Sequence, residues 1–249
     1  GIAFGELFST FYSVRGLQKS RSDIFRPGFS FSSIRLRFRE LVPLSLPLTA
    51  NRVLLGLLQG IEAVSIPGCL KLYNHSTSEA LSTYGVLTGM ALPCILFPSA
   101  ITNSVSIMLM PTVAELQVKD QASSIRKLLQ KVLGSCFLMG LFCCLFFLFF
   151  GQLIGQFLFA SDLAGNFIIT LAWICPFLYV NGSLLSVLNG FGKTTTSFTI
   201  NMVGLAIRIG SVFFAIPVFG IRGYLWGLLI SQLAVSICCS VVLKHLISA

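Results

Sequence analysis

The chain has 249 residues, of which 55% are hydrophobic and only 10% are charged. So few charges cannot cover the surface of a water-soluble domain of this size, and the composition therefore excludes an ordinary soluble protein. Lys and Arg outnumber Asp and Glu by 17 to 8, but they lie beside apolar runs and no nucleic-acid-binding motif accompanies them. We expect these cations to face lipid headgroups, and we expect no nucleic-acid partner.

The first forty residues have two parts. Residues 1–14 are apolar but too short to cross about 30 Å of hydrocarbon, and the chain begins with Gly. We interpret residues 1–14 as the end of a helix whose first part precedes this sequence. Residues 15–40 carry seven Lys and Arg and are predicted to form a basic cytoplasmic linker.

Residues 41–249 contain six apolar runs, each near or above the roughly 20 residues that a membrane-spanning helix needs. The predicted spans are 41–66, 84–110, 132–150, 167–190, 199–219 and 224–243. Of the 17 basic residues, 13 fall in alternate connections on one side of the membrane and two fall on the other side. Basic connections remain in the cytoplasm, so the pattern predicts that the linker and the C-terminus are cytoplasmic.

One connection and several prolines depart from a plain helical bundle. Segment 111–131 has apolar residues at helical spacing amid charge, with Ser123 and Ser124 as candidate N-cap residues. It is predicted to form an amphipathic cytoplasmic helix. Prolines such as Pro98 and Pro217 interrupt the spans and predict kinks. Such kinks are typical of proteins that enclose a cavity and move, and also of membrane helices in general.

The cysteines and histidines show no pattern of a metal centre. Seven of the eight cysteines lie in apolar runs, and no Cys-x-x-Cys spacing occurs. We interpret them as small packing residues rather than as a disulfide framework. His75 and His245 have no ligand pattern beside them, so neither a metal ion nor another cofactor is predicted.

Several charged or polar side chains lie inside the predicted spans, where an unpaired charge costs about 3 kcal/mol or more and must face protein or water. The first span has a stripe of Arg52, Gly56, Gln59 and Glu62, and the fifth has a similar stripe of Asn201, Gly204, Arg208 and Ser211. The candidate residues for a substrate cavity are Arg52, Gln59, Glu62, Asn181, Asn201 and Arg208.

Three interpretations of these residues stay open. In the first, the arginines bind an anionic substrate group, because guanidinium geometry suits phosphate. In the second, Arg52 and Glu62 belong to a proton- or ion-linked switch. The third is structural: charge pairs lock helices together, and Asn181 forms a hydrogen bond with a neighbouring helix.

The stretch Asn51–Glu115 carries a resemblance to a known family. It reads NRVLLGLLQGIEAVSIPGCL and, after a short break, SEALSTYGVLTGMALPCILFPSAITNSVSIMLMPTVAE. Farther along, LLSVLNGFGK at 184–193 and the run Gly220-Ile221-Arg222-Gly223 fit the same pattern. Over nearly its whole length, the chain resembles the polysaccharide-biosynthesis branch of the MOP exporter superfamily.

The resemblance implies an all-α polytopic membrane bundle with two six-helix lobes, arranged as a V around a central cavity as in MATE-type transporters. Residues 41–249 would be the C-terminal lobe, and residues 1–14 the end of the last helix of the N-terminal lobe. The implied activity is flipping of a lipid-linked polysaccharide or peptidoglycan precursor across the bacterial cytoplasmic membrane by alternating access, in spore envelope formation. The implied partners are the lipid-linked sugar, the lipid bilayer and the N-terminal lobe.

Three other functions are compatible with parts of this pattern. A cation-coupled multidrug exporter of the same superfamily would need carboxylates within its spans, and only Glu62 lies firmly inside one. A membrane-embedded enzyme would need a catalytic group, but neither histidine has an acidic partner at catalytic spacing, so we expect no enzyme. A non-transporting scaffold for envelope assembly is the third alternative.

Overall fold

The computed structural model describes residues 5, 8–12, 15, 53–73, 76–119 and 122–248. The chain divides into two units, Gly1–Thr49 and Ala50–Ala249. In the first unit, the guanidinium carbon of Arg15 lies 5.5 Å from the centre of the Phe11 ring, which is a cation–π arrangement. Most of the predicted linker lies outside the described residues, so the predicted boundaries at residues 14 and 40 stay predictions.

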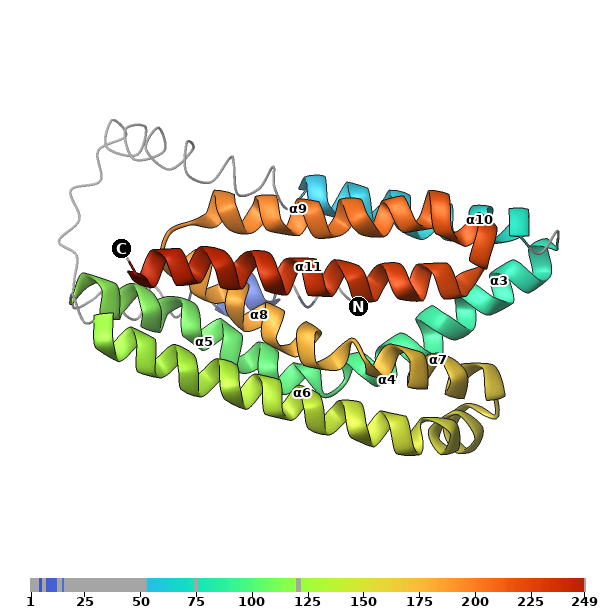
Figure 1. The fold of residues 1–249 in the computed structure, drawn as a ribbon, viewed down its shortest axis with the longest axis horizontal. Helices are drawn as coiled ribbons and strands as arrows, with labels where there is room; N and C mark the ends of the chain where they lie inside the picture. Colours follow the sequence, from blue (N-terminus) through green and yellow to red (C-terminus); the bar gives the residue numbers. More distant parts are fainter. Residues whose placement is uncertain are drawn as a thin grey trace. The chain divides into compact units, whose positions relative to one another are not determined.

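The described residues of the second unit form helices and no strand (Figure 1). In chain order the helices are Val53–Tyr73, α3 (Thr77–Val86), η1 (Leu87–Ala91), α4 (Leu92–Leu96), α5 (Ser99–Val118), α6 (Ala122–Phe159), α7 (Asp162–Ala172), α8 (Cys175–Gly190), α9 (Thr194–Gly210), η2 (Ser211–Ala215), α10 (Ile216–Phe219) and α11 (Ile221–Ser248). The segments η1 and η2 are π-helical turns inside longer helices.

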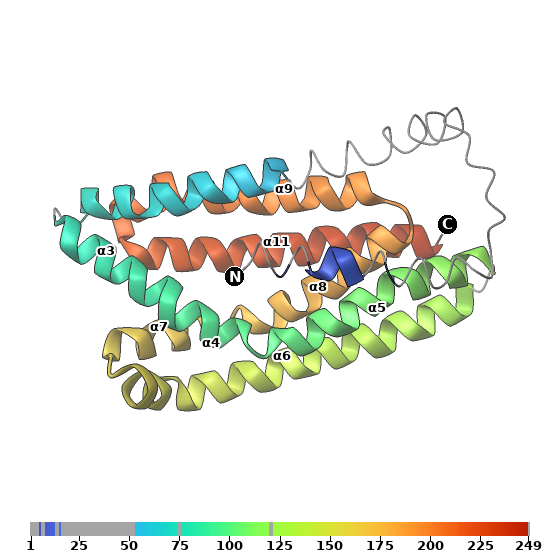
Figure 2. The same cartoon turned by 180° about the vertical axis from the view of Figure 1, so that it is seen from behind.

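These helices make successive passes in opposite directions (Figures 1 and 2). The helices α3 to α5 run antiparallel to α6, α8 returns beside α5 and α6, and α9 and α11 form an antiparallel pair. Five stretches are long and apolar enough to cross a membrane, and the pair α7 and α8, which is bent by 55°, supplies a sixth if it is one span. The predicted all-α polytopic membrane bundle is confirmed.

One end of this unit collects basic residues, and we call it the basic end. The α5–α6 turn, the α8–α9 turn and the C-terminal end of α11 all lie there (Figure 1). Its basic residues within the described part of the chain are Lys119, Arg126, Lys127, Lys131, Lys193 and Lys244. The opposite end has Lys71 and Arg222. The uneven distribution of basic residues among the connections of the sequence thus places most of the described cations at one end of the bundle.

Two of the predicted connections are much shorter than expected. The predicted connection 67–83 is largely helical, because one helix continues to Tyr73 and the next begins at Thr77. The predicted amphipathic helix 111–131 is wrong as a separate element, since α5 extends through its first part and α6 begins within it. Backbone hydrogen bonds continue past the edge of the hydrocarbon, so hydropathy marks the membrane boundary and not the helix end.

The helix ends that the structure describes have local causes. The Ser161 hydroxyl caps α7 by accepting from the amide of Ala164 at 3.3 Å. Between α10 and α11, Gly220 has φ +61°, and a Cβ there would lie 2.8 Å from the ring of Tyr73. Only Gly combines that backbone conformation with that contact, so the sharp reversal between these helices depends on it.

The buried apolar side chains of the described residues form two clusters. The larger one joins the helix Val53–Tyr73 to α3, α4, α6, α7 and α8, and includes Leu87 and Ile168. The second lies nearer the basic end and includes Val113, Ile125 and Leu129. These three residues belong to the stripe that suggested a surface helix in 111–131. Their burial shows that the stripe packs inside the bundle instead.

Glycines allow the helices to approach closely in several places. A Cβ at Gly140 in α6 would lie 2.6 Å from the Cα of Pro176, at the bend between α7 and α8. A Cβ at Gly155 would collide with the backbone of Gly165 in α7. Close backbone approach at small residues is the usual way in which membrane helices pack, because lipid provides little hydrophobic driving force between them.

We predict that Gly155→Ala destabilises the protein, because overpacking of a close contact costs about 1–3 kcal/mol. The matched control is Gly134→Ala in the same helix, where a Cβ would meet nothing within 4 Å. The measurement is the thermal unfolding midpoint of the purified chain in detergent. A lower midpoint is expected for Gly155→Ala alone, and equal midpoints for the two variants would contradict the packing argument.

Candidate functional site

A buried carboxylate lies in the middle of the helix Val53–Tyr73. Glu62 is only 3% exposed, and Ile66 and Leu70 are buried on the same face of this helix. An isolated charge at this position would be strongly destabilised, so its partners decide whether it can remain ionised.

Arg208 and Tyr224 donate three hydrogen bonds to Glu62. The Nε and Nη2 atoms of Arg208 donate to the two carboxylate oxygens at 2.9 Å and 2.7 Å. The Tyr224 hydroxyl donates to Oε1 at 2.9 Å. The contact between Glu62 and Arg208 is bidentate, which is the strongest geometry for a guanidinium and a carboxylate. We call these three residues the Glu62 cluster.

The Glu62 cluster connects three passes that are far apart in the sequence. Glu62 lies in the first pass, Arg208 near the end of α9, and Tyr224 in the first turn of α11. The Glu62 side chain is 2% exposed, whereas that of Arg208 is 25% exposed. The cluster therefore joins helices in the interior and leaves part of one guanidinium at the surface of the bundle.

The predicted polar stripe of the fifth span packs mainly against α11. The Ser231 hydroxyl donates to the carbonyl of Gly204 at 2.8 Å, and a Cβ at Gly204 would lie 2.6 Å from the side chain of Val235. One helix turn beyond Arg208, Ser211 lies directly against Gly227. The close packing of this stripe against α11 places Arg208 within hydrogen-bonding distance of Glu62. Asn201, at the start of the stripe, is half-buried.

The predicted stripe of the first span is divided by the fold. Gly56 and Gln59 are exposed on the described bundle, whereas Glu62 points into it. Residues 59 and 62 are separated by about 60° around the helix, which is enough to place them on different sides of the packing boundary. Arg52 lies outside the described residues, so its predicted pairing stays a prediction, and the partner that the structure gives Glu62 is Arg208.

Asn181 makes hydrogen bonds between helices. Its Nδ2 donates to the backbone carbonyl of Gln232 at 3.0 Å and to the side-chain Oε1 of Gln232 at 2.7 Å. Asn181 is 4% exposed, and these bonds join α8 to α11. The contacts are those that the structural interpretation of Asn181 requires.

Sequence reasoning missed several polar residues that connect the helices. Tyr224 was only the first residue of a predicted span, although a Tyr close to the end of an apolar run often has a hydrogen-bond partner. The hydroxyls of Ser106 and Ser183 lie 3.0 Å apart between α5 and α8. The Tyr179 hydroxyl donates to the carbonyl of Ile95 at 2.8 Å, just before the break at Pro98. That bond satisfies a carbonyl at a helix break, where apolar surroundings make an unpaired group costly.

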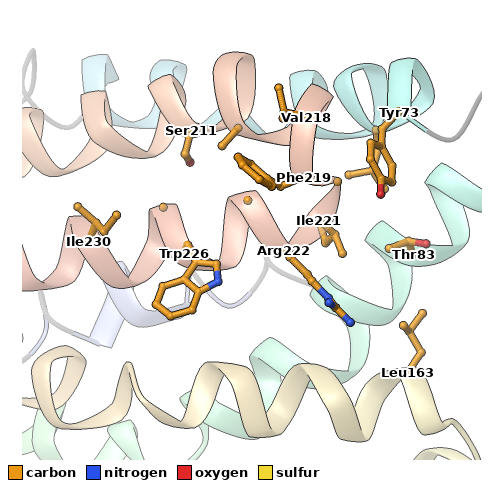
Figure 3. A pocket seen from close by; sticks show the side chains of 15 residues that line it. Tyr73, Thr83, Leu163, Ser211, Val218, Phe219, Ile221, Arg222, Trp226 and Ile230 are labelled. Carbon is orange, nitrogen blue, oxygen red and sulfur yellow. The ribbon is translucent and has the colours of Figure 1, made fainter.

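A cavity of about 930 Å³ lies toward the end opposite the basic end. Tyr73, Thr83, Ser211, Arg222 and Trp226 are among the residues that line it (Figure 3). Figure 3 shows the Arg222 side chain extending from the start of α11 between Thr83 and Leu163. The three residues of the Glu62 cluster do not line this cavity, so the cluster and the cavity are separate features of the described bundle.

The helical passes, the apolar exterior and the buried ion pair define a polytopic membrane protein. Stage V sporulation protein B of Bacillus subtilis (strain 168) is 26% identical to the chain over 223 residues, which are 88% of this chain and 43% of that protein. Sporulation protein YkvU of the same organism is 26% identical over 93 residues, which are 37% of this chain and 21% of that protein. No family model matches the chain, and no solved structure matches it.

These similarities confirm the resemblance to the polysaccharide-biosynthesis branch of the MOP exporter superfamily that the sequence motifs indicated. The chain spans less than half the length of each of these two relatives. The match to stage V sporulation protein B covers 88% of the chain, so it extends well beyond the motif-rich stretch Asn51–Glu115.

We predict that Arg208→Ala strongly destabilises the protein, because it leaves a buried carboxylate without its counter-charge. Breaking a buried pair in this way costs about 3–5 kcal/mol. The double variant Glu62→Gln with Arg208→Gln should recover much of the loss, since no charge then remains buried. The measurement is the unfolding midpoint in detergent, together with the amount of protein in the membrane.

A control for this prediction is available at the surface. Lys119 donates to Glu115 at 2.6 Å, and both side chains are more than half exposed. Lys119→Ala should leave the unfolding midpoint nearly unchanged, because exposed pairs are screened by water. The assignment of the Glu62 cluster fails if Lys119→Ala and Arg208→Ala have equal effects.

Proposed function

We propose that this chain is one lobe of a two-lobe membrane exporter that flips a lipid-linked sugar precursor across the bacterial cytoplasmic membrane. The observation that carries the proposal is the similarity to stage V sporulation protein B, which covers 88% of the chain and 43% of that protein. An exporter of this kind moves its substrate without covalent change. In this proposal, a second lobe provides the other side of the transport pathway.

The breaks in the helices support a protein that changes conformation. The π-turn η1 is followed by Pro93 and the π-turn η2 by Pro217, and α7 and α8 meet at a bend of 55°. π-turns are rare in proteins in general and common at functional sites. Because such breaks concentrate bending at a few residues, they suit alternating access better than a bundle of straight helices would.

The Glu62 cluster has a structural part in this mechanism. By joining three passes, it holds them as one body that moves together when access alternates. Both carboxylate oxygens of Glu62 already accept hydrogen bonds from Arg208 or Tyr224. This arrangement disfavours the alternative of a cation-coupled drug exporter, which would need that carboxylate as an open binding site for the coupling ion.

The cavity around Arg222 supplies chemistry that suits a sugar phosphate. A guanidinium binds phosphate oxygens, and Tyr73 and Trp226 add aromatic rings with polar groups at their edges. Thr83 and Ser211 add hydroxyls. With the basic end in the cytoplasm, the cavity faces the outer side, where a flipped headgroup would arrive. Both relatives are named as sporulation proteins, so we place the substrate among the precursors of a spore envelope.

A chimera tests the proposed function. The segment of stage V sporulation protein B that matches this chain is replaced by this chain, in a Bacillus subtilis strain that lacks its own copy. We predict that the chimera restores heat-resistant spores, and that Arg222→Gln in the chimera lowers their number while Lys71→Gln does not. Membrane abundance of each chimera is measured in parallel. A chimera that accumulates normally but restores no spores would count against the proposal.

The proposed orientation has a separate test. In a cysteine-free background, a single cysteine at position 123 should react with an impermeant reagent only from the cytoplasmic side, because the basic end stays inside. Single cysteines at positions 76 and 161 should react only from outside. Labelling of position 76 from the cytoplasm alone would reverse the assignment for every pass.

A further inference from the structure

A second groove lies at the basic end, between the first turns of α6 and the last turns of α11. Its volume is about 400 Å³. The residues that line it are Arg126, Leu129, Gln130, Leu133, Leu184, Ser240, Leu243 and Lys244. They come from α6, α8 and α11, so the groove is formed by the packing of three passes and not by a single helix.

The two charged residues of this groove lie nearer the basic end than Leu133 does. The helix α6 begins at the basic end and α11 ends there (Figure 1). Arg126 in the first turns of α6 and Lys244 in the last turns of α11 therefore both lie near the basic end. Leu133 lies seven residues farther along α6 than Arg126, which is about 10 Å deeper at the rise of an α-helix. Two cations near the basic end, together with leucines along the groove, match the polarity of a lipid molecule.

The charges around the groove favour an anion. Both ionisable residues that line it are cations, and Gln130 and Ser240 add hydrogen-bonding groups. Lys127 and Lys131 lie on the same helix but do not line the groove. Basic grooves between membrane helices at this level bind anionic lipid headgroups.

We propose that this groove binds an anionic glycerophospholipid of the surrounding bilayer. The lipid phosphate lies between Arg126 and Lys244, where the guanidinium of Arg126 can engage two phosphate oxygens. One acyl chain lies along Leu129, Leu133 and Leu184. The lipid then bridges α6 and α11, and its binding stabilises the folded bundle. This groove shares no lining residue with the cavity around Arg222, and lipid binding there does not depend on the proposed function.

The test measures lipid retention by the purified full chain in neutral detergent, using native mass spectrometry with added phosphatidylglycerol or phosphatidylcholine. Arg126→Gln and Lys244→Gln should each weaken phosphatidylglycerol binding about fivefold, which corresponds to about 1 kcal/mol for one cation near a membrane surface. Lys127→Gln and Lys131→Gln remove the same charge from the same region and should leave binding unchanged. Leu133→Trp should abolish retention by filling the part of the groove that takes the acyl chain.

Three results would overturn the proposal. Equal retention of phosphatidylcholine would show that the phosphate charge is not recognised. Equal weakening by Lys127→Gln and Arg126→Gln would show diffuse attraction without a groove. Displacement of phosphatidylglycerol by a low concentration of a polyprenyl diphosphate would assign the groove to the transported class of lipid. Because Arg126 and Lys244 are exposed, their variants should keep the wild-type helical circular dichroism. If either variant is unfolded, the test rests on Leu133→Trp, and retention of phosphatidylglycerol by that variant would contradict the proposal.

Discussion

The Glu62 carboxylate and its three hydrogen bonds set the arrangement of the bundle. A charge in the interior of apolar helices is tolerated only when its partners hold it in good geometry, and here Arg208 and Tyr224 provide that geometry. If Arg208 turned away, the buried carboxylate would lose its counter-charge, and if Tyr224 turned away, Glu62 would lose one of its three hydrogen bonds. The relative rotation of the first, fifth and sixth passes is therefore fixed by one group, and the small residues between α9 and α11 bring Arg208 within its reach.

Two kinds of contact hold the helices together. Where the helices are straight, glycines and serines allow close backbone approach, as at Gly155 and Gly204. Where they are broken, side-chain donors satisfy exposed carbonyls, as Tyr179 does for Ile95. In such a bundle the helix–helix interfaces are rigid, and bending is concentrated at the helix breaks. The cavity around Arg222 and the groove around Arg126 lie near opposite ends of the passes, and both combine an arginine with a partly apolar wall.

The sequence was sufficient for the class of fold and the passes, because the length of an apolar run is dictated by the thickness of the bilayer. It was not sufficient for the helix ends, since residues such as Leu70 and Val113 continue a helix beyond the expected boundary and pack inside it. The sequence also did not identify Arg208 as the partner of Glu62. Arg208 is 146 residues away, and periodicity within one helix does not say which other helix lies beside it. Both residues were candidates for a substrate cavity, and the structure places them in contact with each other. Gln59 was grouped with Glu62 because a stripe on an isolated helix does not show where packing begins.

The two π-turns have a consequence for insertions and deletions. A π-turn holds one residue more than an α-turn, so the extra residue is absorbed locally and the helix beyond it keeps its face. Within Ser211–Ala215, one residue could therefore be lost while Ile216 and Gly220 still meet their present neighbours. A deletion elsewhere in the same pass would turn every later side chain by about 100°. The π-turns are thus the places where these passes can change length during evolution without exchanging their buried and exposed sides.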